Sequence, residues 1–289
     1  MRTSPLLAIV GETASGKSSM AMALAKRFNG ELICADSWTV YKGFDIGTAK
    51  PSSEDQRRVR HHLLDVAEPE QGFSAVLFQK LAREVIADIE ARNKLPILVG
   101  GTGLYIDSVI FSYEFLPPPS PQLRAELNAL SLDEVVERAN RLGLDLTSID
   151  ARNKRRVIRL IENNGQLPGK GPLRENTLIL AIDTDRENLK ERIAARVDAM
   201  LAAGLEDEVR QLSEKYGWNV EPMKGISYSE WQPYFAGVHD LEQTKQRIIK
   251  DTLDLAKRQR TWFKRNKAIN YLCNTDEAVE LTTTFLNKS

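Results

Sequence analysis

Hydrophobic and polar residues form alternating blocks at the start of the chain. Leu6–Val10 is a continuous apolar run before a glycine-rich turn, which predicts a buried strand. After the turn, Met20, Leu24 and Phe28 recur at intervals of four residues and so mark one face of a helix. Leu32–Ala35 is a second apolar run and predicts a second strand. A strand, a helix and a strand in this order favour a parallel sheet with right-handed crossovers.

The same pattern continues further along the chain. A helical pattern begins at Ser74, and Pro96–Val99 predicts a third strand that Gly100-Gly101 closes. Leu178–Ile182 predicts another strand after a long interval. Two later helical patterns and a last strand are predicted at Glu187–Glu214, Leu241–Lys267 and Ile269–Leu272. We therefore predict an α/β fold, with a parallel sheet flanked by helices.

A proline-rich segment interrupts this α/β pattern. Leu116 is followed by three consecutive prolines, which can continue neither a helix nor a central strand. The pattern is then helical up to about Asn164, and Gly165–Pro172 is predicted as a loop. We therefore predict a small helical insertion at 117–171, within a core made of residues 1–116 and 172–289.

The composition is that of an ordinary globular protein. A chain of 289 residues is long enough to bury a large core, as one domain or one domain with an insertion. No apolar run approaches the roughly 20 residues of a membrane span, so no membrane association is expected. Cys34 and Cys273 are too few and too far apart for a disulfide framework, which fits a cytoplasmic location.

The distribution of charge says more about partners than its sum. The formal net charge is zero, which alone argues against a nucleic-acid partner. From Thr244 to Lys267, however, nine basic residues against two acidic ones give +7. Charge runs are most often solvated helix faces, so neither this stretch nor a second one identifies a partner by itself. The second basic stretch contains Arg152, Lys154, Arg155, Arg156 and Arg159.

The turn after the first strand carries a phosphate-binding motif. Gly11–Ser18 reads GETASGKS and fits G-x-x-x-x-G-K-[ST], between a predicted strand and a predicted helix. Backbone amides of such a loop wrap a phosphate group at the positive end of a helix. Lys17 is expected to bridge phosphate oxygens and Ser18 to hold Mg²⁺ as the metal cofactor. The motif predicts di- or triphosphate binding through Gly11, Thr13, Ala14, Ser15, Gly16, Lys17 and Ser18.

Acidic residues beside this loop are fewer than in most P-loop nucleotide hydrolases. Those enzymes place a carboxylate at the end of another strand. Here the strand Pro96–Val99 ends in Gly100-Gly101-Thr102, and the strand-end acid near the loop is Asp36. Two hypotheses remain open at this point: a small-molecule kinase, and a transferase that holds a diphosphate leaving group.

Ala35–Pro51, His61–Asp65, Val99–Tyr105 and Ala256–Phe263 are four segments with distinctive motifs. All four resemble one family, the tRNA dimethylallyltransferases, also called tRNA isopentenyltransferases. The longest, Ala35–Pro51, is similar to the family's D-S-x-x-x-Y-K-G-x-D-I-G-T-A-K-P stretch. The resemblance extends from Gly11 to about Arg265. The other segments are His61–Asp65 (HHLLD), Val99–Tyr105 (VGGTGLY) and Ala256–Phe263 (AKRQRTWF), which look like the family's H-H-L-x-D, V-G-G-T-x-L-Y and A-K-R-Q-x-T-W-F.

This resemblance implies a prenyl transfer. A dimethylallyl group would pass from dimethylallyl diphosphate to the N6 amine of an adenosine next to the anticodon in tRNA, with release of diphosphate. Asp36 would be the general base for this weak nucleophile, although its position alone suits a helix cap or a Mg²⁺ ligand equally well. Arg210 would stabilise the diphosphate, and Thr102 would form a hydrogen bond near the reacting centre.

The resemblance also implies contacts to the anticodon loop of tRNA. We expect the protein to be a monomer. The target adenine would leave its stack to reach the carboxylate. Trp38, Trp262 and Phe263 are candidate stacking side chains, although core packing is the commoner role of an aromatic residue. The tRNA-contacting residues would be Asp36, Ser37, Trp38, Thr39, Thr102, Arg124, Arg155, Arg156, Arg159, Lys257, Arg258, Gln259 and Arg265.

Some positions depart from the family pattern, and other functions stay open. Ser227-Tyr228-Ser229-Glu230 stands where the family usually has G-Y-K-E, Leu253 stands where it has arginine, and the insertion is short. The alternatives are a kinase of the shikimate or nucleoside type, a prenyltransferase acting on free adenylate, and a non-catalytic RNA-binding protein with a nucleotide switch.

Overall fold

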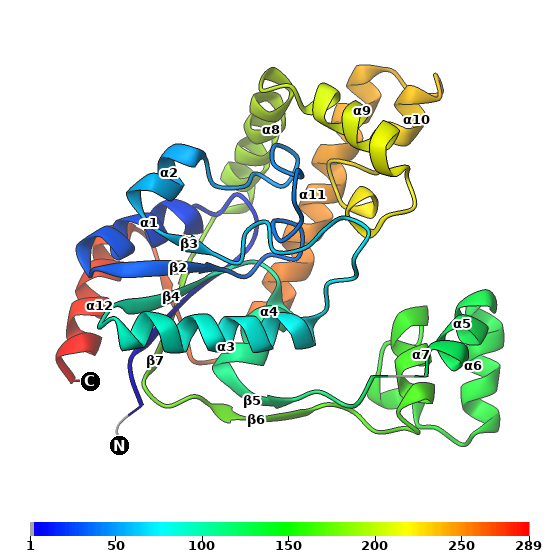
Figure 1. Cartoon of the computed structure of the whole chain (residues 1–289), viewed down its shortest axis with the longest axis horizontal. Coiled ribbons are helices and arrows are strands. Elements are labelled where there is room, and N and C mark those ends of the chain that lie inside the picture. The colour runs from blue at the N-terminus through cyan, green and yellow to red at the C-terminus, as the bar shows by residue number, and fades with distance from the viewer. Residues whose placement is uncertain (1–2, 119, 289) are drawn as a thin grey trace. The chain divides into compact units, whose positions relative to one another are not determined.

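The core of the protein is a six-stranded sheet in which the strand pairings are parallel (Figure 1). The structure is a computed structural model that describes residues 3–118 and 120–288. All five residues of the first strand are buried, because it lies between two neighbours inside the sheet. The predicted parallel α/β sheet is therefore confirmed. The strands, in spatial order, are β3 (His61–His62), β2 (Gly30–Cys34), β4 (Leu95–Gly100), β1 (Leu6–Val10), β7 (Thr177–Ile182) and β8 (Ile269–Leu272).

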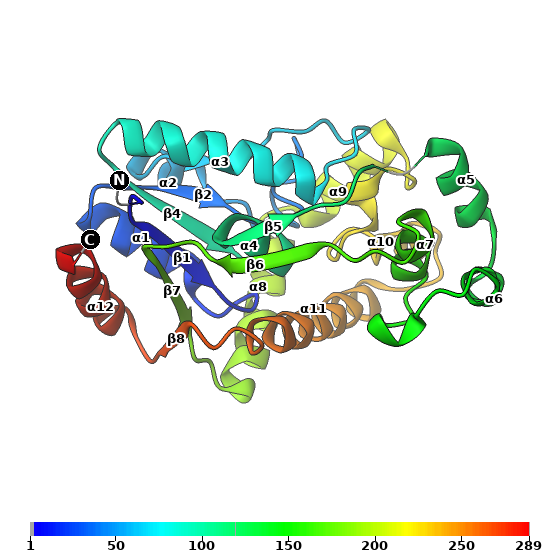
Figure 2. The same cartoon turned by 90° about the horizontal axis from the view of Figure 1, so that it is seen from below.

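Helices cover both faces of this sheet (Figure 2). The side chains of Leu7 and Ile9 point to one face, where they pack with Met20 and Leu24 in one hydrophobic cluster. Because side chains alternate along a strand, the neighbouring apolar residues face the other side. Parallel strands also bring all of their carboxyl ends to one edge, where ligands bind in folds of this kind. The first face carries α1 (Lys17–Arg27) and α12 (Thr275–Lys288), and the second carries α3 (Ala75–Ala91) and α4 (Gly103–Ile110).

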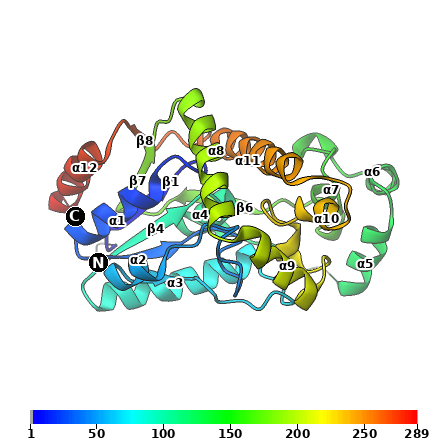
Figure 3. The ribbon, with the colours of Figure 1, turned by 90° about the horizontal axis from the view of Figure 1, so that it is seen from above.

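A second hydrophobic cluster lies among the helices that follow β7. In Figure 3, α8 lies beside α11, and the two helices contact each other. The sequence predicts one helical pattern over Glu187–Glu214, whereas the structure has two helices separated at Gly204. Gly204 has a φ of 96°, a left-handed conformation that ends one helix and lets the chain turn into the next. The helices of this cluster are α8 (Arg186–Ala202), α9 (Leu205–Tyr216), α10 (Trp231–Phe235) and α11 (Leu241–Phe263).

Residues Phe111–Pro172 form a separate compact unit. Leu127, Val135, Val157 and Ile161 belong to its own buried cluster, so this unit has a core of its own. The helical segment expected at 117–171 lies within it. Its elements are β5 (Phe111–Glu114), α5 (Pro121–Ala129), α6 (Leu132–Arg141), α7 (Lys154–Glu162) and most of β6 (Gly169–Leu173).

The strand pair of this unit is not expected from the sequence. Gly165–Pro172 is predicted as a loop, but β6 pairs with β5 in a two-stranded sheet. The Lys170 ammonium lies 3.9 Å from the centre of the Phe111 ring. A Cβ atom at Gly171 would come within 2.8 Å of the Ser112 side chain. Close backbone approach at glycine, rather than an apolar pattern, therefore forms this strand.

The remaining short elements lie between the larger ones. They are α2 (Ser53–Arg58) and the 3₁₀ turns Leu146–Ser148 and Glu221–Lys224. Within the described part of the chain, no helix combines the length and the apolar character needed to cross a bilayer.

Candidate active site at the carboxyl edge of the sheet

The loop after β1 has the backbone geometry of an anion cradle. Gly11 and Gly16 have φ values of 144° and 98°, which L-residues rarely adopt, and Ala14 has a φ of 60°. The first helix begins at Lys17, so its amino-terminal N–H groups point into the loop. The Ser15 hydroxyl is buried and has no hydrogen-bond partner among the described residues. The loop therefore leaves polar groups that an anion would satisfy.

Lys17 is the central cation of this cradle. Its Nζ atom donates a hydrogen bond of 3.1 Å to the carbonyl oxygen of Glu12. Burial, and then the nearby charge of Arg196, lower the pKa of Lys17 to about 8, while Asp36 and Glu12 act in the opposite direction. An anion in the loop would favour the charged lysine.

Two arginines of α8 reach the same loop. Arg196 donates from Nη1 to the Thr13 hydroxyl at 3.0 Å, and Arg192 donates to the Ser15 carbonyl at 3.4 Å. Burial lowers the pKa of Arg196. The sequence analysis missed both residues. One signal for them was available in the sequence. Their spacing of four residues places them on one face of α8, and α8 follows β7, the strand next to β1.

Arg210 takes a different place from the one expected. It is exposed on α9, where its Nη2 atom lies 2.6 Å from Oε1 of Glu206 and its guanidinium lies 4.6 Å from the centre of the Phe235 ring. The structure does not bring Arg210 into the pocket described below. The turn at Gly204 carries α9 away from the direction of α8, so Arg196 is the arginine that reaches the loop.

Asp36 follows β2 at the same edge of the sheet. Its Oδ1 atom accepts a hydrogen bond of 2.9 Å from the amide of Trp38. The neighbouring Ser37 amide donates to Thr102 Oγ1 at 3.1 Å, and the Thr102 amide donates to the Ala35 carbonyl at 3.2 Å. The segments that follow β2 and β4 are thus bonded to each other on both sides of the Asp36 backbone.

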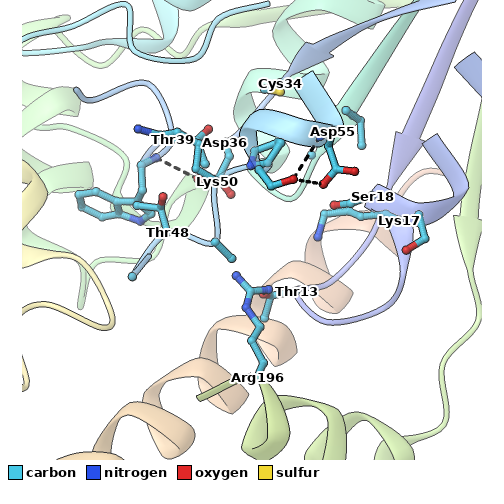
Figure 4. A pocket seen from close by; sticks show the side chains of 18 of the residues that line it. Thr13, Lys17, Ser18, Cys34, Asp36, Thr39, Thr48, Lys50, Asp55 and Arg196 are labelled. Carbon is cyan, nitrogen blue, oxygen red and sulfur yellow. Dashed lines mark hydrogen bonds between the residues drawn. The ribbon is translucent and has the colours of Figure 1, made fainter. Parts of the chain in front are cut away.

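A single pocket of about 820 Å³ joins the cradle to Asp36 (Figure 4). Figure 4 shows Lys17, Ser18, Thr13, Arg196 and Asp36 around this cavity. The cations beside the loop and a carboxylate therefore line the same pocket. Expected site residues that line it are Thr13, Lys17, Ser18, Asp36, Trp38, Thr39 and Gln259, and apolar side chains that line it include Val197, Met200, Ile226 and Leu255.

Apart from those in the segments after β2 and β4, the residues expected to contact tRNA fall into two groups. Lys257, Arg258 and Arg265 are exposed on or just after α11, and Arg155 and Arg156 are exposed on α7. The members of the other group are bonded to other residues of the protein. The Arg124 guanidinium bonds both oxygens of Glu162, Arg159 donates to the carbonyls of Leu116 and Pro117, and Gln259 is buried with its side-chain amide bonded at both ends.

The candidate stacking aromatics are packed in the protein. A Cβ atom at Gly103 would lie 2.3 Å from the Trp262 ring, and one at Gly225 would lie 3.2 Å from Trp38. Phe263 is buried in the core. Of the three, Trp38 also lines the pocket, so it has a face near the cavity.

The segment that departs from the family pattern supports the wall of the pocket. Ser227 lines the cavity with a φ of 75°, a conformation that glycine adopts without strain. Tyr228 donates to Glu208 at 2.7 Å, and the same carboxylate accepts the amides of Ile46 and Gly47. These bonds join Tyr228, Glu208 and the 46–47 backbone, and none of them involves the Ser227 side chain.

The fold and the site define a P-loop α/β protein in which the phosphate loop shares a pocket with a strand-end carboxylate. The sequence model of the family described as IPP transferase matches residues 39–266. The chain therefore belongs to the IPP transferase family.

Relatives and solved structures agree with this family. A tRNA dimethylallyltransferase of Anoxybacillus flavithermus is 40% identical over 285 residues, which are 95% of this chain and 92% of the relative. One from Roseiflexus sp. is 42% identical and covers 90% of each chain. The crystal structure of the tRNA isopentenylpyrophosphate transferase of Bacillus halodurans has a TM-score of 0.76 at 33% identity, with 99% of this chain and 96% of that chain covered. A eukaryotic dimethylallyltransferase acting on tRNA has a TM-score of 0.84 at 25% identity, with 99% and 80% covered.

Proposed function

We propose that this protein transfers a dimethylallyl group from dimethylallyl diphosphate to the N6 amine of an adenosine next to the anticodon in tRNA. The observation that carries the proposal is the shared pocket, in which Lys17 and Asp36 both line the cavity. The names of the relatives, tRNA dimethylallyltransferase, support the same reaction. We further propose that the enzyme acts as a monomer in the cytoplasm.

The phosphate loop holds the leaving group of the donor. Its amides, Lys17 and Arg196 surround the diphosphate, and they stabilise the negative charge that grows on it as the prenyl carbon departs. Arg196 takes the role that the family resemblance suggested for Arg210, because Arg196 is bonded to Thr13 of the loop. The apolar side chains of the pocket receive the hydrocarbon chain.

The residues present fit a magnesium ion bound together with the diphosphate. The described residues contain no cluster of three or more histidine, cysteine or acidic side chains arranged to hold a metal. Mg²⁺ commonly binds through one or two protein oxygens and through the phosphates of a substrate. The Ser18 hydroxyl, in the first turn of α1 and on the pocket wall, would hold it. When bound, the ion would help neutralise the charge of the leaving diphosphate.

Asp36 takes the proton of the incoming amine. The adenine nitrogen forms a bond to the first carbon of the prenyl group while the bond from that carbon to the diphosphate oxygen breaks. The amine proton passes to the Asp36 carboxylate, and diphosphate leaves. The bond from the Trp38 amide fixes the carboxylate, and Thr102 supports the segment that carries it.

The acceptor adenosine enters the pocket from tRNA. A base in a stacked loop must swing out before its amine can reach a carboxylate in a cavity. The exposed cations on and just after α11 would contact tRNA phosphates, and so would those of α7. They include Arg155, Arg156, Lys257, Arg258 and Arg265.

The test is a direct assay with separate acceptors. The protein is incubated with Mg²⁺, dimethylallyl diphosphate and tRNA that lacks the modification, and nucleosides are then analysed by mass spectrometry. We expect a prenylated adenosine from the anticodon loop. Prenyl transfer to free AMP but not to tRNA would favour an adenylate prenyltransferase. Phosphorylation of shikimate or a nucleoside by ATP, without prenyl transfer, would favour a kinase.

A further inference from the structure

The basic helix α11 is attached directly to the phosphate loop. The side chain of Gln259, on α11, accepts a hydrogen bond of 2.8 Å from the backbone amide of Thr13. Its other end donates a bond of 3.0 Å to the carbonyl oxygen of Gly101. Gln259 is only 9% exposed, so both bonds lie away from bulk solvent. One side chain therefore joins the loop after β1 to the loop after β4.

The second of these loops is fitted closely around Gln259. A Cβ atom at Gly101 would lie 2.3 Å from the Gln259 amide nitrogen, so a larger residue there would displace the side chain. Gly100 is just as close to the chain after β2, because its Cβ atom would lie 2.1 Å from the Ala35 carbonyl oxygen. The loops after β2 and β4 are therefore in backbone contact, and the Gln259 side chain links them to the loop after β1.

The hydrogen bonds that begin at Gln259 and Gly101 continue to the segment that contains Asp36, the proposed general base. The next residue, Thr102, donates its amide to the Ala35 carbonyl and accepts the Ser37 amide on its hydroxyl. Asp36 lies between Ala35 and Ser37. A displacement of Gly101 would thus be passed to the backbone on both sides of Asp36.

An ion pair strengthens the attachment on the side of the phosphate loop. Arg260, the residue after Gln259, contacts both oxygens of the Glu12 carboxylate, with Nη2 at 2.7 Å and Nε at 3.1 Å. Glu12 is buried, and bidentate pairs of this kind have a defined geometry. Glu12 and Thr13 are consecutive residues of the loop, so α11 holds this half of the cradle at two points.

We propose that Gln259 is a positioning residue that sets the distance between the phosphate loop and Asp36, and that it acts on prenyl transfer rather than on tRNA binding. This inference rests on the function proposed above. Both polar groups of Gln259 are bonded to the protein backbone, whereas its neighbours Lys257 and Arg258 are exposed. Small errors in the placement of reacting groups reduce the rate of a bound complex, so the effect falls on kcat.

The first test compares Gln259→Met with a matched control, Gln246→Met, on an exposed position of the same helix. Methionine keeps the length of the side chain and removes both hydrogen bonds. We expect Gln259→Met to lower kcat by about 10- to 100-fold and to leave the Kd for tRNA within about twofold. Gln246→Met should match the wild type. Thermal unfolding shows whether each variant is folded.

A second variant, Gln259→Glu, separates positioning from packing through its pH profile. A protonated glutamic acid can replace both bonds of the amide, whereas the carboxylate cannot donate to Gly101. Burial favours the protonated form. We therefore expect kcat of Gln259→Glu, relative to the wild type at the same pH, to rise as the pH falls from 8 to 6. The corresponding ratio for Gln259→Met should not change with pH. If Gln259→Met does not fold, Gln259→Glu serves as the test.

The outcomes separate this inference from the proposed function. If wild-type protein does not prenylate tRNA in the assay, the proposed function is wrong and this inference is overturned with it. If the wild type is active, a kcat of Gln259→Met within twofold of it overturns only the positioning role. Weakened tRNA binding with an unchanged kcat would also overturn it. So would a ratio of Gln259→Glu kcat to wild-type kcat that does not change with pH.

Discussion

The phosphate pocket and the helical unit 111–172 use basic residues in opposite ways. In the pocket, the charge of Arg196 lowers the pKa of Lys17, and these two cations are bonded to a hydroxyl and a carbonyl. In the helical unit, Arg124 is bonded to a carboxylate, Glu162, whose side chain is 0% exposed. The cations of the pocket donate to neutral oxygen atoms, whereas Arg124 completes an ion pair.

This difference shows how ligand-binding cations can be distinguished from structural ones. Burial of like charges carries an energetic cost that a bound anion offsets. An arginine in a complete ion pair binds a phosphate weakly, because the arginine would first have to be separated from its carboxylate. Counting basic residues in the sequence treats Arg124, Arg196 and Arg210 alike, but their partners in the structure differ.

The largest expected effect comes from removing the carboxylate of the pocket. Asp36→Asn keeps the shape and can still accept the bond from the Trp38 amide, but it cannot take a proton. We expect the single-turnover rate of prenyl transfer to fall by about 10²- to 10⁴-fold, with little change in the Kd for dimethylallyl diphosphate. A rate near that of the wild type would show that another group is the base.

A pair of arginine variants tests which cation serves the donor. Arg196→Ala removes a charge next to the phosphate loop, and we expect kcat/KM for the donor to fall by about 100-fold. Arg210→Ala removes an exposed residue paired with Glu206, and we expect a change below about twofold. Steady-state kinetics at saturating tRNA measures both. The reverse order would restore Arg210 as the diphosphate ligand.

The pocket should also show a pH dependence that the helical unit lacks. The pKa of Lys17, lowered to about 8 in the folded protein, means that the free enzyme loses this charge as the pH rises through 8. The affinity for dimethylallyl diphosphate should therefore decrease by up to about 10-fold between pH 7 and pH 9. Calorimetry in buffers of different ionisation enthalpy should detect proton uptake on binding at pH 8.5. Binding with no proton uptake would contradict this account.

The sign of the linked stability change follows from the same pKa. Because the folded value lies below the ordinary value of 10.5, the unfolded chain binds more protons between pH 8 and pH 10.5. Lys17 alone therefore destabilises the ligand-free protein below pH 8, and this contribution is relieved as the pH rises. Diphosphate should stabilise the protein most on the neutral side of pH 8.

The smallest effects are expected for single arginines of the helical unit. Arg156→Ala removes one exposed charge, so tRNA affinity should fall about threefold and the salt dependence of binding should decrease by about one unit of slope. Arg124→Ala leaves Glu162 without its bidentate partner, so it should lower the unfolding temperature more than it lowers tRNA affinity. Filter binding at several salt concentrations and thermal unfolding distinguish the two. A larger loss of tRNA affinity for Arg124→Ala than for Arg156→Ala would contradict these assignments.

Much of the core could be predicted from local sequence. The apolar run Leu6–Val10 coincides with β1, because a strand buried on both faces needs no alternation. Lys17 and Asp36 each follow a strand of the parallel sheet, so their meeting at one edge follows from topology. The motif and the fold rule together were sufficient for these two residues.

Other features depend on contacts that no local pattern shows. The direction of α9 depends on one left-handed glycine, Gly204, so the sequence alone could not tell which arginine reaches the loop. The strand Gly169–Leu173 lacks alternation, and the roles of Gln259 and Arg260 depend on groups about 250 residues away in the chain. Such long-range polar contacts are visible only after the fold is known.

The most direct measurement is a crystal structure of the protein with Mg²⁺ and a dimethylallyl thiolodiphosphate that reacts slowly. We predict that the diphosphate lies within about 3.2 Å of the Lys17 ammonium and the Arg196 guanidinium, with the first prenyl carbon facing Asp36. A diphosphate bound outside the loop would contradict the account. So would packed side chains separating that carbon from the Asp36 carboxylate.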